Sequence, residues 1–124
     1  MACAAGRAAL RVIAEEGMQR NALEVGTLFG RALERAATHP RVGQVRGRGL
    51  MRGIEFVRDR ATRETFPWRE RRHLRIHRHA LGRGVLLRPL GNVIYFMPPY
   101  VVTPEEIELM VTVGREGLDL AVAG

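Results

Sequence analysis

Residues 84–110 read GVLLRPLGNVIYFMPPYVVTPEEIELM, and this stretch decides the fold. Its first part holds two short apolar runs, 84–88 and 93–97, which predict two strands. The residues between them, Pro89 to Asn92, are turn formers, so the two runs are expected to form a hairpin. The pair Pro98-Pro99 ends the second run, because proline has no N–H to donate to a ladder.

The second part of the stretch, Thr103-Pro104-Glu105-Glu106, predicts the start of a helix. Threonine is a favoured N-cap, proline suits the first helical position, and a glutamate three residues after the cap can complete a capping box. Apolar residues then recur at helical spacing, which gives the helix one face to bury. That face consists of Ile107, Met110, Val111, Gly114 and Leu118.

The residues before the hairpin supply the other expected elements. Residues 2–38 have helical periodicity, with a break expected near Gly17 because glycine weakens a helix. After this break, one apolar face is expected, formed by Ala22, Val25, Phe29, Leu33 and Ala36. Two strands are expected at 42–45 and 50–57, and a further helix at 68–81. The predicted buried line of that further helix is Leu74, His77 and Leu81.

This order of elements predicts an α+β fold, an α/β sandwich in which helices pack on one small, mostly antiparallel sheet. The length of 124 residues suits a single domain, 1–124, in which 1–38 form a helical lead-in and 42–124 the sheet-and-helix core. No apolar run approaches the roughly 18 residues that a membrane span needs. The single cysteine, Cys3, cannot form an internal disulfide, so a cytoplasmic location is expected.

All twenty basic residues are arginine, and the net charge is +7. The absence of lysine excludes a Schiff-base lysine and a P-loop lysine. Residues 69–83 are rich in arginine and histidine, which can indicate a nucleic-acid or acidic partner. No aromatic residues interleave these charges, so a solvated helix face is the favoured interpretation. His73 and His77 have metal-ligand spacing, but no carboxylate or cysteine accompanies them, which disfavours a metal site.

Arg88 is the candidate binding residue, because it sits between Leu87 and Pro89 in an otherwise apolar hairpin. We expect it to be largely enclosed, and a buried charge requires a partner. One interpretation is a bidentate clamp for the carboxylate of a ligand, with the Tyr95 hydroxyl nearby on the second strand. The other is a structural salt bridge or an exposed edge position. The residues alone do not decide between them.

Three segments together resemble the class-III aminotransferase family, which uses pyridoxal phosphate. They are ACAAGRAALRVIAEEG at 2–17, VRGRGLMRGIEFVRD at 45–59, and the capped helix from Thr103. The resemblance runs through essentially the whole chain in order. The run RPLGNVIYFMPPY at 88–100 is similar to the branch of the family that acts in biotin synthesis.

This resemblance implies the small C-terminal domain of a fold type I enzyme that works as a homodimer. It implies that Arg88 holds the carboxylate of the keto substrate and that Tyr95 lies near that substrate. The implied reaction is transfer of the amino group of S-adenosylmethionine to 8-amino-7-oxononanoate.

The family's cofactor lysine, its aspartate for the pyridine nitrogen and its phosphate-binding threonine all lie upstream of the matching region. We therefore expect part of an enzyme that needs a large domain as partner and that does not bind pyridoxal phosphate covalently by itself. The alternative is a non-catalytic binding or regulatory module on the same fold, for a carboxylate ligand or an anionic partner.

Overall fold

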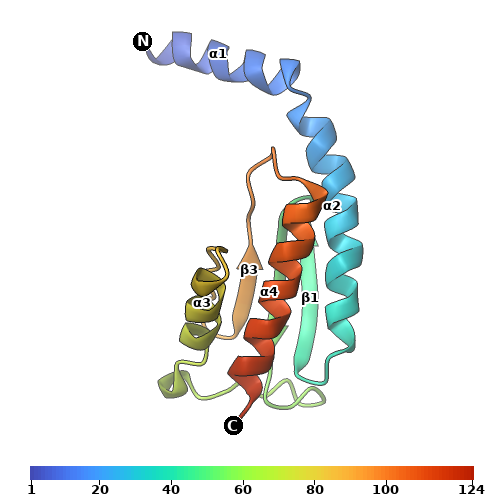
Figure 1. Ribbon diagram of the computed structural model, residues 1–124, viewed down its shortest axis with the longest axis vertical. Coiled ribbons are helices and arrows are strands. Elements are labelled where there is room, and N and C mark those ends of the chain that lie inside the picture. The colour runs from blue at the N-terminus through green and yellow to red at the C-terminus, as the bar shows by residue number, and fades with distance from the viewer.

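The computed structural model describes all 124 residues, Met1 to Gly124. In chain order the elements are α1 (Ala2–Glu15), α2 (Met18–Glu34), the 3-10 helix η1 (Arg35–Thr38), β1 (Val42–Arg48), β2 (Met51–Phe56), the 3-10 helix η2 (Trp68–Glu70), α3 (His73–Gly82), β3 (Val93–Phe96) and α4 (Pro104–Val122). Helix α4 lies across the sheet between α2 and α3, and the two chain ends lie at opposite ends of the molecule (Figure 1). The predicted α+β class is confirmed.

The three strands form one antiparallel sheet in the order β1-β2-β3. Ile54 at its centre pairs with Val45 of β1 and with Ile94 of β3, and the three side chains join the core. A two-residue turn, Gly49-Leu50, connects β1 to β2. Gly49 has a φ of +55°, the sign that the first residue of a type II′ hairpin turn requires. This tight turn fixes the register of the sheet.

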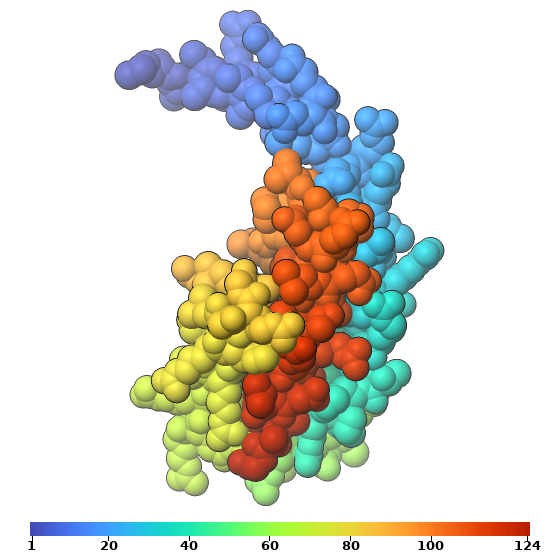
Figure 2. Space-filling view, viewed as in Figure 1, coloured from blue at the N-terminus to red at the C-terminus, as the bar shows by residue number.

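The predicted break near Gly17 is confirmed, because Gly17 has a φ of +62° and separates α1 from α2. Helix α1 has no buried residue and projects away from the rest of the fold (Figures 1 and 2). Leu10 on α1 is 70% exposed. A 14-residue helix has little stability in water without a packed face, so α1 presents an apolar surface that lacks a partner within this chain. No helix of the chain combines the length and hydrophobicity that crossing a bilayer requires.

One hydrophobic cluster of 21 residues fills the space between the sheet and the helices. The predicted apolar faces of α2 and α4 supply it, through residues such as Phe29 and Ile107, which are fully buried. The Phe29 and Phe96 rings meet edge to face with centroids 5.5 Å apart. At Gly114 a Cβ atom would lie only 2.8 Å from the Phe96 ring, so the glycine lets α4 approach β3 closely.

Helix α2 approaches the β1–β2 hairpin through two glycines. A Cβ atom at Gly26 would lie 3.0 Å from the backbone of Gly49, and one at Gly30 would lie 3.0 Å from the Arg52 guanidinium. The Arg52 guanidinium donates to the carbonyls of Gly26, Gly49 and Gly47 at 2.9, 2.9 and 3.3 Å. The Arg52 guanidinium is thus satisfied by backbone oxygens alone, and its bond to the Gly26 carbonyl holds α2 against the hairpin.

Helix α3 packs on α4 with a face that differs from the predicted one. Its buried residues are Ile76 and Ala80, whereas Leu74 and His77 are half-buried and Leu81 is 51% exposed. The predicted line of Leu74, His77 and Leu81 is therefore wrong. The reason lies on α4: a Cβ at Gly117 would be 3.0 Å from Ile76, so the glycine opens a hollow for that side chain.

Glu116 of α4 forms hydrogen bonds at the outer side of the contact between α3 and α4. Its carboxylate accepts from His79 Nε2 at 2.9 Å and from the Arg83 guanidinium at 2.7 Å. These bonds, with that of His79 the largest cause, hold the pKa of Glu116 below its ordinary value. The pairing joins α3 to α4 across a partly exposed seam.

The segment 84–88 is not a strand, which corrects the prediction of a second hairpin there. Val85 and Leu87 are buried while Leu86 and Arg88 are exposed, so the predicted alternation is present. The backbone does not pair with β3, however, except at the turn, where Leu90 and Val93 exchange hydrogen bonds of 2.8 and 2.9 Å. Beyond that turn no backbone hydrogen bond joins segment 84–88 to β3.

The predicted start of the last helix is confirmed in full. The Glu106 backbone N–H donates to the Thr103 hydroxyl at 3.3 Å, and the Thr103 N–H donates to the Glu106 carboxylate at 2.9 Å. Pro104 follows the cap. This capping box satisfies two donors that would otherwise lack a partner.

Replacing Thr103 with alanine is therefore expected to lower the free energy of unfolding by about 1 kcal/mol. Urea unfolding followed by circular dichroism measures the change. Thr27→Ala is the matched control, because Thr27 lies exposed inside α2 and its hydroxyl bonds only to the Leu23 carbonyl of its own helix. Equal effects of the two substitutions would contradict a specific capping role.

Candidate functional site

A pocket of about 560 Å³ lies between segment 84–88 and the residues from Tyr95 to Pro99. Segment 84–88 forms one wall, β3 and the residues after it form a second wall, and the first turns of α4 close the end. Most of the lining is apolar, including Leu87, Met97 and Met110. A pocket of this size and lining suits a small ligand with an apolar body.

Arg88 and Tyr95, the two site residues predicted from the sequence, line this same pocket. Arg88 comes from the irregular segment and Tyr95 from β3, opposite Gly53 of the neighbouring strand. Tyr95 is 38% exposed. The structure therefore brings the guanidinium and the phenol to one cavity, although the hairpin that was expected to join them is mostly absent.

Arg88 is exposed, which corrects the expectation that it would be enclosed. It takes part in no ion pair and no hydrogen bond, so a structural salt bridge within this chain is not realised, whereas the exposed position named in the same alternative is what the structure shows. The physical reason is the alternation of the segment. Leu87 points into the core, and the next side chain along an extended backbone points the opposite way.

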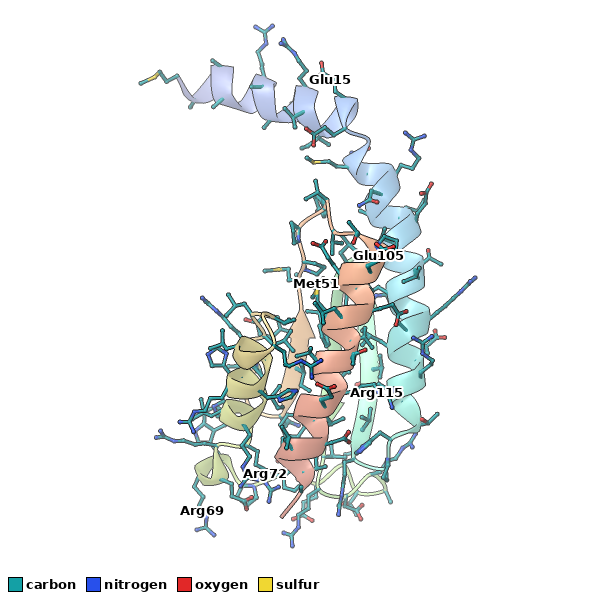
Figure 3. The ribbon with its side chains drawn as sticks, viewed as in Figure 1. Glu15, Met51, Arg69, Arg72, Glu105 and Arg115 are labelled. Carbon is teal, nitrogen blue, oxygen red and sulfur yellow. The ribbon has the colours of Figure 1, made fainter.

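The other charged group of the pocket is already engaged. Glu106 lines the cavity, but its carboxylate accepts the Thr103 N–H of the capping box. Neighbouring Glu105 is held by its own backbone N–H and by the Thr103 hydroxyl, which together keep the pKa of its carboxyl below the usual value. Figure 3 shows Glu105 at the start of α4. The pocket thus presents one unpaired cation, and an anionic group carried on an apolar chain complements it.

The other clusters noted in the sequence have structural roles. No group of three or more potential ligands is arranged to hold a metal, and the His73 ring stacks on Trp68 at 5.1 Å. Arg72 lies over the Phe66 ring at 4.1 Å and donates to the Ala121 carbonyl at 2.6 Å. Figure 3 places Arg69 and Arg72 at the end of the molecule far from Glu105. Arg72, Arg75 and Arg83 thus bond to α4 and the residue after it, whereas the other three arginines of segment 69–83 are exposed.

A family model described as aminotransferase class-III matches residues 1–114, a range that includes the pocket. The chain belongs to the class-III aminotransferase family. Relatives named adenosylmethionine-8-amino-7-oxononanoate aminotransferase are 38% identical over 118 residues in Anoxybacillus flavithermus and 47% identical over 81 residues in Geobacter sulfurreducens. These matches cover 95% and 65% of this chain but 26% and 17% of those proteins.

A crystal structure supports the same assignment. The aminotransferase of that name from Methanocaldococcus jannaschii superposes with a TM-score of 0.87 and 34% identity, over 94% of this chain and 27% of that one. The chain thus spans about a quarter of the length of these two relatives. The predicted resemblance to this family is confirmed.

The residues of this chain do not fit a covalent site for pyridoxal phosphate, the cofactor of class-III aminotransferases. The chain has no lysine, and its single amine, at Met1, lies at the far end of the projecting helix α1 (Figure 1). We expect that incubation with pyridoxal phosphate followed by borohydride reduction leaves every internal peptide unmodified. Peptide mass mapping provides the measurement. A reduced adduct on any residue other than Met1 would contradict the expectation.

Sequence reasoning overlooked one residue near the site. His77 was assigned only to a buried line or a metal pair, yet its Nδ1 lies 2.6 Å from the Leu87 carbonyl oxygen, next to Arg88. Spacing could not have found this contact, because it joins a helix to an irregular segment ten residues away.

Proposed function

We propose that this chain is the substrate-binding C-terminal part of a pyridoxal-phosphate aminotransferase. In the complete enzyme, the amino group of S-adenosylmethionine is transferred to 8-amino-7-oxononanoate, a step of biotin synthesis. The names of the relatives support this choice within the family. The cofactor supplies the amino-transfer chemistry, and the residues that bind it belong to the large domain of the complete enzyme.

The observation that carries the proposal is the unpaired Arg88 in a largely apolar pocket. The acceptor is a nine-carbon acid, with a carboxylate at one end and the reacting ketone near the other. Its carboxylate suits the planar fork of Arg88, and its methylene chain suits a wall that includes Met97 and Met110. Tyr95 is placed to contact the same molecule. The role of this chain is therefore to orient the acceptor rather than to react with it.

We propose that the large domain covers the exposed arginine and the apolar face of α1, and that the complete enzyme is a homodimer. The exposed Leu10 on α1 and the exposed Leu86 beside the pocket support this assembly, because a covering domain would remove both side chains from water. Covering the pocket would also strengthen an arginine–carboxylate pair by excluding water.

A chimera tests the proposed function. This chain replaces the corresponding C-terminal quarter of the Methanocaldococcus jannaschii aminotransferase, and the unmodified enzyme serves as control. We expect formation of 7,8-diaminononanoate that depends on S-adenosylmethionine and on pyridoxal phosphate. A chimera that folds and binds the cofactor but does not use 8-amino-7-oxononanoate would contradict the proposal. Carboxylate binding by the 124-residue chain with no activity in that chimera would favour a non-catalytic binding module instead.

A further inference from the structure

The segment that carries Arg88 lacks the hydrogen bonds that normally hold a strand. At its start, the Val85 N–H donates to the Ala80 carbonyl at the end of α3, at 2.9 Å. At its far end, Leu90 pairs with Val93. Between these two points the only hydrogen bond that links the backbone to another element is the 2.6 Å contact of His77 with the Leu87 carbonyl oxygen.

The chemistry of this contact determines that Nδ1 of the His77 ring carries a proton. A carbonyl oxygen can only accept, so Nδ1 of His77 must carry the proton and donate it. The bond exists in both the neutral and the cationic ring, because Nδ1–H is present in each. The His77 side chain of α3 thus binds a backbone carbonyl that would accept a hydrogen bond from a neighbouring strand if 84–88 were part of the sheet.

Two further constraints act on the residues beside this bond. The Leu87 side chain is only 1% exposed and anchors the segment in the core. Pro89 restricts the backbone of Arg88 to extended conformations, since its ring clashes with a helical residue before it. Arg88 therefore lies between a hydrogen-bonded carbonyl on one side and a proline on the other, with its side chain directed out of the core.

We propose that His77 is a positioning residue, which aims Arg88 at the pocket by holding the Leu87 carbonyl. The effect of His77 on use of the acceptor rests on the proposed function, whereas its hold on the Leu87 carbonyl does not. A guanidinium held in place before the ligand arrives loses less conformational freedom on binding, which improves recognition of a carboxylate. His77 touches neither substrate nor cofactor in this scheme and acts through the backbone.

The structural content is tested on the 124-residue chain by NMR. In the unmodified chain we expect the ring-nitrogen signals of His77 to report the Nδ1–H tautomer. In His77→Leu we expect the backbone amides of Leu87 and Arg88 to become more mobile on the nanosecond scale. His77→Asn, whose side-chain NH₂ can reach the same carbonyl, should restore their order. An Nε2–H tautomer, or unchanged mobility in His77→Leu, would overturn the proposal whether or not the complete enzyme is active.

The matched control is His79→Leu on the same helix. His79 is also half-buried and bonded, but its partner is Glu116 rather than the segment with Arg88. If α3 merely loosens, both leucine variants will mobilise Leu87 and Arg88 equally, and that result would overturn a specific role for His77.

The catalytic consequence is tested in the chimera described above. We expect His77→Leu to lower kcat/KM for 8-amino-7-oxononanoate by roughly 3- to 10-fold, the range of one hydrogen bond, mainly through KM. His77→Asn should recover most of the loss, and His79→Leu should show none. Equal losses for the leucine and asparagine variants would overturn the proposal. An inactive unmodified chimera would instead contradict the proposed function, and the NMR result on the chain would still decide the role of His77.

Discussion

Replacing Arg88 with alanine in the active chimera is expected to lower kcat/KM for the keto acceptor by roughly 30- to 5000-fold. The figure corresponds to the about 2–5 kcal/mol lost when one partner of an enclosed, hydrogen-bonded charge pair is removed. The carboxylate of the acceptor would then lie unpaired against a largely apolar wall. Single-turnover measurements that follow each half-reaction separately provide the test. Arg88→Lys should recover only part of the loss, because an ammonium cannot form the planar two-bond contact.

The control for this experiment is Arg115→Ala. Arg115 is exposed on α4 and takes part in no ion pair (Figure 3), so its removal changes the net charge equally without touching the pocket. S-adenosylmethionine also carries a carboxylate, so a smaller loss in the donor half-reaction agrees with the proposal. Equal losses in both half-reactions would indicate a clamp shared by the two substrates. No loss in either would show that Arg88 does not bind substrate.

The second large effect is expected from Gly47→Ala, which should lower the free energy of unfolding by about 3 kcal/mol or more. Gly47 has a φ of +145°, a region that side chains rarely adopt, and its added Cβ would lie 2.3 Å from the Met51 carbonyl oxygen. Because the two nearest clashing atoms, the Met51 carbonyl oxygen and the Arg52 Cα, belong to the backbone, no rotamer change can relieve the clash. The hairpin that Arg52 joins to α2 would have to shift. Urea unfolding with tryptophan fluorescence from Trp68 measures the change.

Gly6→Ala is the control for that substitution. Gly6 lies inside α1 with no atom near its would-be Cβ, so alanine there is expected to be neutral or to stabilise the helix by about 0.5–1 kcal/mol. If Gly47→Ala proved as harmless as Gly6→Ala, the tight hairpin described for β1 and β2 would be wrong.

Local chemistry made much of this fold predictable. The capping box at Thr103, the break at Gly17 and the buried faces of α2 and α4 all depend on residues within one or two turns of each other. Such signals are complete in the sequence, because the cap, the break and the periodicity of each helix are all defined by residues of one short segment. The presence of Arg88 and Tyr95 in one pocket also followed from the short connection between them.

The errors arose where the partner is distant. Buried and exposed residues alternate in 84–88 as predicted. Whether such a segment joins a sheet also depends on a neighbouring strand that can pair with it, and the alternation carries no information about that strand. Its apolar neighbours Leu87 and Pro89 were used to infer that Arg88 is enclosed, although adjacent residues of an extended chain face opposite sides. Leu86, two residues away and also exposed, was the informative neighbour. The hollow that Gly117 leaves for Ile76 likewise required knowledge of two helices at once.

The junction between α2 and the β1–β2 hairpin and the junction between α3 and α4 respond differently to acid. Arg52 bonds to one carbonyl oxygen of α2, at Gly26, and to two of its own hairpin; none of these oxygens titrates, so falling pH leaves that junction unchanged. Glu116 joins α4 to α3 as a carboxylate whose pKa is lowered by His79 and Arg83. Its contribution to stability is complete above the ordinary glutamate pKa of 4.5 and is lost as pH falls through the lowered pKa, because the folded chain must then take up a proton it otherwise excludes. Acid would therefore weaken the outer side of the contact between α3 and α4, while Ile76 and Ala80 stay buried against α4 and keep His77 near the segment that carries Arg88.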